Sequence, residues 1–397
     1  MGSHTSGGQH TPHSLDKVTF AGLLISLGII YGDIGTSPLY VMKSVVGEGK
    51  VIDRNIVLGG VSLVFWTLTI QTTIKYIIFV LQADNKGEGG IFSLYSLVRR
   101  RERWLMYPAI LGGCAMLAEG IITPPISVSS AIEGLQLKYP GIPTVPIIIG
   151  IISALFFIQR LGTAAVGKSF GPIMMLWFGM LGALGISQVI HEPVVFQAVN
   201  PIFGINLLLS SPSALVVMGA VFLCTTGAEA LYADMGHCGR QNIRISWIFV
   251  KSCLLLNYFG QAAWLLHHEG KVLEENPFYG VMPEWFLWPG IIIATMATII
   301  ASHAMITGSF TLVSEAIRLG FLPKMTVKFP TNLKGQIYIP AVNTFLWLGC
   351  IAVMLKFQTS SNMEAAYGLS VICTMLCSTI LLSNWFVLHR KKEILVW

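Results

Sequence analysis

Long apolar stretches separated by short polar loops occupy almost the whole chain of 397 residues. A helix of about 20 mostly apolar residues is long enough to cross the hydrocarbon core of a bilayer. By that measure the sequence predicts ten membrane-spanning segments, at residues 19–45, 56–82, 105–131, 143–160, 166–190, 212–236, 245–267, 284–315, 338–357 and 363–388. The expected fold class is therefore an all-α membrane protein.

The composition agrees with a lipid environment. Hydrophobic residues make up 54% of the chain and charged residues only 11%, whereas soluble domains contain about 25% charged residues. We expect a disordered polar tail at 1–16, five helices in 17–190, an extracellular connection at 191–211, five helices in 212–390 and a short cytoplasmic end at 391–397.

Basic residues are concentrated in alternate loops between these segments. The loops richest in Lys and Arg face the cytoplasm in most membrane proteins. A cytoplasmic N-terminus places these basic residues in cytoplasmic loops: Arg99, Arg100, Arg101, Arg103, Arg160, Lys168, Arg240, Arg244, Arg318, Lys324, Lys328, Lys334, Arg390, Lys391 and Lys392. The net charge of +6 thus reflects the basic loops that set the orientation of a multi-pass protein of the cell membrane, embedded in lipid. It does not indicate nucleic-acid binding, because no basic groove with interleaved aromatic residues accompanies it.

Two of the predicted helices are interrupted near their centres. Residues 32–38 read GDIGTSP and residues 224–229 read CTTGAE, so each run combines glycine with a carboxylate, and the first also contains proline. Such runs should unwind helices 1 and 6. The breaks lie five segments apart, so the second occurs in a helix of opposite direction, as in an inverted repeat of five plus five helices. Discontinuous helices at corresponding positions indicate a binding site near the bilayer midplane.

Three carboxylates lie near the middle of predicted segments: Asp33, Glu119 and Glu229. An ionisable group at that depth costs at least about 2.5 kcal/mol on insertion scales, which makes each of them a functional candidate. Hydroxyl groups surround the same level, and oxygen atoms of this kind suit a hard cation. Thr123 and Ser127 share one face of segment 3 with Glu119. Each single hydroxyl could equally well bond to the carbonyl of its own helix.

Other classes of function fit less well. Residues 162–169 match the phosphate-binding pattern GxxxxGK[ST], but no strand precedes them and a membrane segment lies on either side. No pairing of nucleophile and base emerges either, so we expect no enzyme and no cofactor. A potassium channel would need four TVGYG-like loops, which are absent from the sequence. A carrier of organic amines, or a passive cation path, stays open as an alternative.

Five motifs resemble those of the KUP/HAK/KT potassium uptake family. They are GDIGTSPLY at 32–40, ADNKGEGG at 83–90, GIITP at 120–124, EALYADMGH at 229–237 and GQIYIP at 335–340. They occur in family order and cover the chain from about residue 18 to 390. The resemblance implies the fold of the amino acid, polyamine and organocation superfamily, potassium as the transported ion, and symport with protons.

The same resemblance implies roles for individual residues. The potassium-binding set is expected to comprise Asp33, Tyr40, Thr123, Ser127, Thr226 and Tyr367, of which Asp33, Tyr40, Thr123 and Thr226 ligate the ion. Glu119 and Glu229 are expected to handle protons, and which of them carries the coupled proton is open. Tyr367 lies in the outer half of segment 10, where an ordinary interfacial aromatic residue is an equally good interpretation.

Relatives in this family continue through two further membrane helices and a cytoplasmic C-terminal region. This sequence stops at Trp397, just after Arg390, Lys391 and Lys392. We therefore expect a chain that lacks those parts but retains the ten-helix core. The resemblance also makes a homodimer a candidate assembly.

Overall fold

The computed structural model describes residues 18–85, 88–100, 102–161, 164–329 and 337–396. The expected polar tail at 1–16 lies outside these residues. Within them the regular structure is helical, with only isolated bridges between extended residues, such as Val51 with Val272 and Lys328 with Tyr338. The expected all-α class is therefore confirmed.

The first half of the chain begins with the elements α1 (Phe20–Ile29), α2 (Gly32–Thr36), η2 (Ser37–Leu39), α3 (Val41–Val46), α4 (Arg54–Thr67), η3 (Leu68–Phe79), η4 (Val80–Gln82) and α5 (Ile91–Val98). It continues with η5 (Arg103–Leu105), α6 (Met106–Glu133), η6 (Gly134–Leu137), α7 (Thr144–Ile158), η7 (Gln159–Leu161), α8 (Ala164–Val189), η8 (Pro193–Val199) and α9 (Pro201–Ser210). The η elements are short 3-10 helices except η3, which is a π-helix.

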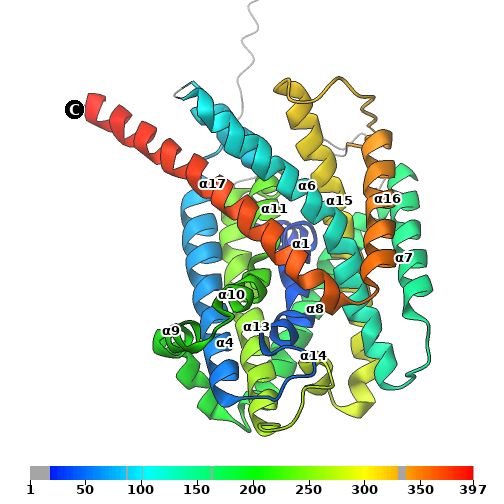
Figure 1. Ribbon diagram of the computed structural model, residues 1–397. Helices are drawn as coiled ribbons and strands as arrows, with labels where there is room; N and C mark the ends of the chain where they lie inside the picture. The colour runs from blue at the N-terminus through cyan, green and yellow to red at the C-terminus, as the bar shows by residue number, and fades with distance from the viewer. Residues whose placement is uncertain (1–17, 86–87, 101, 162–163, 330–336, 397) are drawn as a thin grey trace, which may run out of the picture.

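The second half contains α10 (Ala214–Phe222), η9 (Leu223–Thr225), α11 (Ala228–Ala233), α12 (Met235–Cys238), α13 (Arg240–His267), α14 (Pro277–Gly280), η10 (Glu284–Phe286), α15 (Leu287–Arg318), α16 (Pro340–Phe357) and α17 (Ser360–Val396). The helix α17 continues past residue 388, where the last predicted segment ends. Figure 1 shows most of the long helices running between the same two ends of the molecule, with α6 and α17 crossing it at a tilt.

In the described part of the chain, not every predicted segment corresponds to a helix that is both long and apolar enough to cross a membrane. Among the described residues, seven helices are long and apolar enough to cross a membrane, or nine if two bent helix pairs count as one span each. The predicted ten is not confirmed by this measure. Helix α7 has 15 residues and is only about 22 Å long, and α13 carries polar residues such as Asn257 and Gln261 in its interior.

The first break differs in detail from the expected unwinding of residues 32–38. The chain bends by 68° between Phe20–Ile29 and Gly32–Leu39, so the break falls at Ile30 and Tyr31. The residues after it keep single helical turns, because Pro38 sits in the first turn of η2, where its missing N–H costs nothing. Gly32 allows the close approach, since a Cβ there would lie 2.9 Å from the Cα of Ala301.

The second break lies where the sequence predicts it. Thr226 is extended, with φ −52° and ψ 145°, and Gly227 adopts a left-handed conformation with φ 78°. The expected connection at 191–211 also contains helices, since η8 and α9 form a pair bent by 77°. Pro193 and Pro201 open these two helices at positions that suit proline.

Helix packing joins elements far apart in the sequence. The helix α6 packs along α17 and α15, and α13 packs along α8. The carboxylate of Glu133, at the end of α6, accepts hydrogen bonds from the backbone N–H and the hydroxyl of Ser360, both at 2.8 Å, and so fixes the start of α17. Glycines allow the closest approaches: a Cβ at Gly185 of α8 would lie 2.3 Å from the carbonyl oxygen of Leu256 in α13.

We expect Gly185→Ala to lower the stability of the folded protein by about 1–3 kcal/mol, because the added methyl group meets backbone that cannot move aside. Thermal unfolding of the purified protein in detergent measures the effect. The matched control is Gly179→Ala on the same helix, where a Cβ meets nothing within 4 Å. Equal melting temperatures for the two variants would contradict the proposed close packing of α8 and α13.

Candidate functional site

The backbone carbonyls exposed by the first break are held by side chains from other elements. The indole of Trp177 in α8 donates to the carbonyl of Gly35 at 2.9 Å, and the amide of Gln261 in α13 donates to that of Pro38 at 2.9 Å. Asn276 donates to the carbonyl of Leu39 at 2.7 Å. Because lipid offers no hydrogen bonds, a break inside a membrane needs such partners. Each of these three carbonyls thus has a hydrogen-bond partner from another element.

The two breaks face one another directly. The hydroxyl groups of Ser37 in η2 and Thr226 lie 2.7 Å apart. Gly227 is next to Asp33, and a Cβ at position 227 would lie 2.8 Å from the Cβ of Asp33 and 3.0 Å from the backbone nitrogen of Ile34. A glycine is required here both by the left-handed backbone and by the lack of space.

The carboxylate of Asp33 is the centre of this region. The hydroxyl of Tyr367 in α17 donates to both of its oxygens, at 3.2 Å each, and accepts a hydrogen bond from Thr123 of α6 at 2.8 Å. Tyr40 lies beside this group: its hydroxyl donates to Ser37 at 3.5 Å, and its ring centroid is 6.5 Å from that of Tyr367. Asp33 is 3% exposed, so the site is closed to solvent.

The structure brings five of the six expected ion-binding residues into this one network: Asp33, Tyr40, Thr123, Thr226 and Tyr367. Ser127 lies one turn beyond Thr123 on α6, and its hydroxyl is buried without a hydrogen-bond partner among the described residues. Buried hydroxyls of this kind normally have a partner. Ser127 therefore has an oxygen free for a ligand. Tyr367 is fully buried and is not an interfacial aromatic residue.

Glu119 and Glu229 lie outside the immediate shell of Asp33 and have hydroxyl partners of their own. Thr374 of α17 donates to Glu119 at 2.6 Å. The hydroxyl of Tyr76 in η3 donates to Glu229, and Tyr76 is also 3.0 Å from the hydroxyl of Ser378. Both carboxylates are buried, at 2% and 4% exposure.

Four polar residues around these carboxylates were not found by sequence reasoning: Lys75, Tyr76, Thr374 and Ser378. A lysine inside the apolar stretch 56–82 was a visible signal for the first. Thr374 and Ser378 give a weaker signal. Together with Tyr367 they are separated by seven and four residues, so the three lie on one face of a helix.

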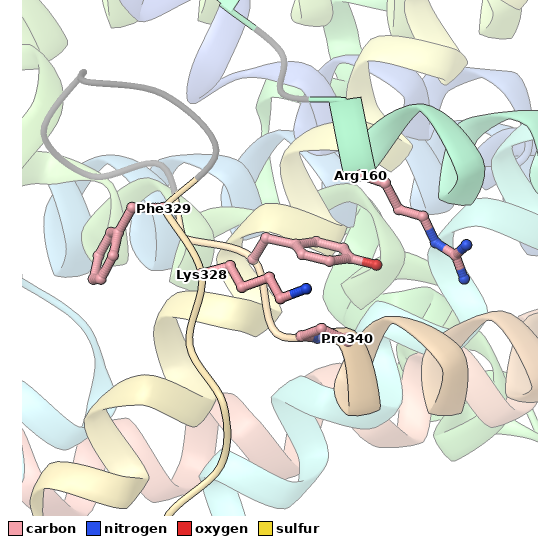
Figure 2. A pocket seen from close by; sticks show the side chains of 5 residues that line it. Arg160, Lys328, Phe329 and Pro340 are labelled. Carbon is pink, nitrogen blue, oxygen red and sulfur yellow. The ribbon is translucent and has the colours of Figure 1, made fainter.

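A surface pocket of about 400 Å³ lies elsewhere. Figure 2 shows Arg160, Lys328, Phe329 and Pro340 around it, and Tyr338 completes the lining. Of residues 162–169, the sequence that matches the phosphate-binding pattern, 162 and 163 lie outside the described residues. Residues 164–169 belong to the helix α8, and the helical elements α7 and η7 precede them, whereas the nucleotide-binding loop requires a preceding strand.

The fold and the buried network define a class: a multi-pass α-helical membrane protein with a buried carboxyl group among hydroxyl groups, between two broken helices. Residues 20–397 match the family described as the K+ potassium transporter integral membrane domain. The chain belongs to this family. That result confirms the resemblance seen in the five motifs.

Curated relatives agree with the family. The chain is 60% identical over 390 residues to the probable potassium transport system protein Kup of Cytophaga hutchinsonii, covering 97% of this chain and 59% of that protein. It is 58% identical over 386 residues to the protein of the same description from Flavobacterium johnsoniae, covering 95% and 59%. One from Clostridium perfringens is 50% identical over 400 residues, covering 96% and 61%. These names describe transport proteins and not enzymes, as the sequence predicts.

We expect Gly227→Ala to destabilise the protein by at least about 1–2 kcal/mol, because alanine resists the left-handed backbone and its methyl group meets Asp33. The melting temperature in detergent reports the change. Gly219→Ala, eight residues earlier in the same broken span, is the control, since a Cβ there meets nothing within 4 Å. Unchanged melting of Gly227→Ala would refute the tight contact between the two breaks.

Proposed function

We propose that this protein is a potassium uptake transporter of the cell membrane. The ion binds at Asp33 between the two helix breaks, uptake is coupled to protons, and the site is exposed to the two sides of the membrane in turn. The N-terminus lies in the cytoplasm. The chain spans about 60% of the length of the curated relatives it matches, so the activity is argued here from this chain's own site.

The observation that carries the proposal is the buried carboxylate of Asp33 among hydroxyl oxygens from several helices. Oxygen ligands suit a hard monovalent ion, and a single carboxylate matches its charge. Asp33, Ser127 and Tyr367 are each at most 3% exposed. A site sealed from both sides fits a carrier that alternates between two openings, whereas a channel needs a continuous path.

The placement of Glu119 and Glu229 supports proton coupling. Each has a hydroxyl partner of its own, and neither forms a hydrogen bond to the groups around Asp33 among the described residues. Whether a buried carboxyl group is charged or neutral depends on its surroundings. Glu119 lies close enough to both Asp33 and Glu229 to interact with them electrostatically. Binding of a cation at Asp33 can therefore influence proton binding nearby.

The inverted repeat is supported by equivalent helix contacts. In the predicted numbering, helix 1 (α1) packs on helix 5 (α8), and helix 6 (α10) packs on helix 10 (α17). Glycine pairs bring both interfaces close: a Cβ at Gly28 would lie 2.7 Å from the backbone nitrogen of Gly171, and one at Gly368 would lie 2.7 Å from the carbonyl oxygen of Gly219. Contacts of α6 with α17 and of α8 with α15 are a second equivalent pair.

We expect the purified protein in proteoliposomes to take up rubidium, a potassium analogue, in a manner blocked by excess potassium but not by sodium or spermidine. A pH dye inside should report acidification during uptake. Asp33→Asn should reduce uptake to the level of empty liposomes, because the amide removes the charge that binds the cation. Glu102→Gln, an exposed carboxylate, is the control.

The outcomes separate the alternatives. Displacement of rubidium by spermidine would favour a carrier of organic amines. Uptake without acidification would indicate a passive cation path. Normal uptake by Asp33→Asn, with wild-type insertion into membranes, would remove Asp33 from the site.

We expect Glu119→Gln to take up rubidium at a rate that no longer responds to an imposed proton gradient, because the amide cannot exchange a proton. Rubidium uptake is measured over a range of external pH with and without the gradient. The exposed Glu284→Gln should keep the wild-type dependence. If Glu119→Gln also keeps it, the proton is carried elsewhere, with Glu229 as the next candidate.

A further inference from the structure

The second membrane span changes its winding where it passes the buried carboxylates. After the α-helix α4, residues 68–79 form the π-helix η3, in which hydrogen bonds join residues five apart. π-Helical turns are rare and are frequently found at functional sites. The wider turn changes the direction of the side chains, and it presents Lys75 and Tyr76 together to α17 and α11.

The ammonium group of Lys75 is fully engaged inside the protein. It donates to the carbonyl of Met375 at 2.9 Å, to the hydroxyl of Ser378 at 3.2 Å and to the hydroxyl of Tyr76 at 3.3 Å. An ammonium has three donors, so all three have partners. The nitrogen also lies 4.7 Å from the centre of the Tyr76 ring, within the range of a cation–π contact.

These partners connect Lys75 to Glu229. The hydroxyl of Tyr76 donates to the carboxylate of Glu229 and is 3.0 Å from that of Ser378. Among the described residues, the titratable groups in electrostatic range of Glu229 include Lys75, Tyr76, Glu119 of α6, Cys377 of α17 and Tyr232 of its own helix. Among these groups, Lys75 supplies the positive charge.

The simplest alternative for a lysine in this place is a side chain that extends towards the membrane surface. Lys75 lies seven residues before the end of the span at Gln82, which is within reach of an interface. Its three contacts point the other way, to α17 and to its neighbour Tyr76. A charge held inside a membrane-spanning segment in this way requires an opposite charge nearby.

We propose that Lys75 is a positioning residue for Glu229, and that it supplies, through Tyr76 and Ser378, the positive charge against which Glu229 binds and releases its proton. The inference rests on the proposed proton-coupled transport. With Lys75 charged, the ionised form of Glu229 is favoured, because the pair is then neutral as a whole. The same contacts attach α17 to η3 at Met375 and Ser378, next to the Thr374 that bonds to Glu119.

The first experiment measures rubidium uptake as a function of external pH. In Lys75→Met, Glu229 keeps its proton to higher pH, so the pH of half-maximal uptake should rise by roughly one unit or more. Lys75→Arg keeps the charge and should retain the wild-type profile. The control is Lys251→Met, a half-buried lysine of α13. A wild-type pH profile in an active Lys75→Met would overturn the proposal.

The second experiment does not depend on transport. Melting temperatures are compared for Lys75→Met, Glu229→Gln and the double variant. Each single change leaves one charge inside the protein without its partner, so the double variant should melt above either single variant. If the two effects simply add, the pairing of Lys75 with Glu229 is wrong. If the wild-type protein shows no uptake while this comparison succeeds, the proposed function fails and the charge pair stands.

Discussion

A helix that breaks inside a membrane exposes backbone groups to which lipid offers no hydrogen bonds, and this constraint organises the structure around helix 1. The carbonyls of Gly35, Pro38 and Leu39 are each bonded to a side chain from another element. Two of those side chains, Trp177 and Gln261, belong to α8 and α13, which pack closely on each other through glycines. The position of the break is therefore determined by the helices behind it.

Once the first break is held, the position of the second follows from lack of space. Gly227 leaves room for Asp33, and the left-handed turn at Gly227 ends the helical turn before α11. The carboxylate is then enclosed by hydroxyls and receives hydrogen bonds only from Tyr367 among the described residues. A buried carboxylate with few donors is costly to ionise, and a cation bound beside it would offset that cost by balancing the charge.

Much of this arrangement could be predicted from the sequence. The apolar stretches, the glycines at 32 and 227 and the midplane acids are local signals. They placed the second break correctly, whereas the first falls at Ile30 and Tyr31, just before the predicted run 32–38. The count of spans was less secure, since α7 is short and α13 has a polar interior. Tyr367 was identified only through the family resemblance. Its hydrogen bonds depend on how α17 is rotated against α6, which no local pattern records.

The remaining site residues were missed for the same physical reason. Lys75 could extend to the interface or turn inward, and the choice depends on the π-helical winding of η3 and on the neighbouring carbonyl of Met375. A hydropathy value is the same for both orientations, because it does not depend on where the lysine side chain points. A polar contact between helices depends on the positions of both helices, so it can be identified only from the three-dimensional structure.

The helix α17 connects the candidate sites mechanically. One of its faces carries Tyr367 against Asp33, Thr374 against Glu119, and Ser378 beside the group that holds Glu229. These positions span about three turns of a rigid rod, so a tilt or rotation of α17 changes all three contacts together. Under the proposed function, an ion that alters the bond between Asp33 and Tyr367 acts on both carboxylates through a single helix. Coupling between cation and proton then requires no direct contact between their sites.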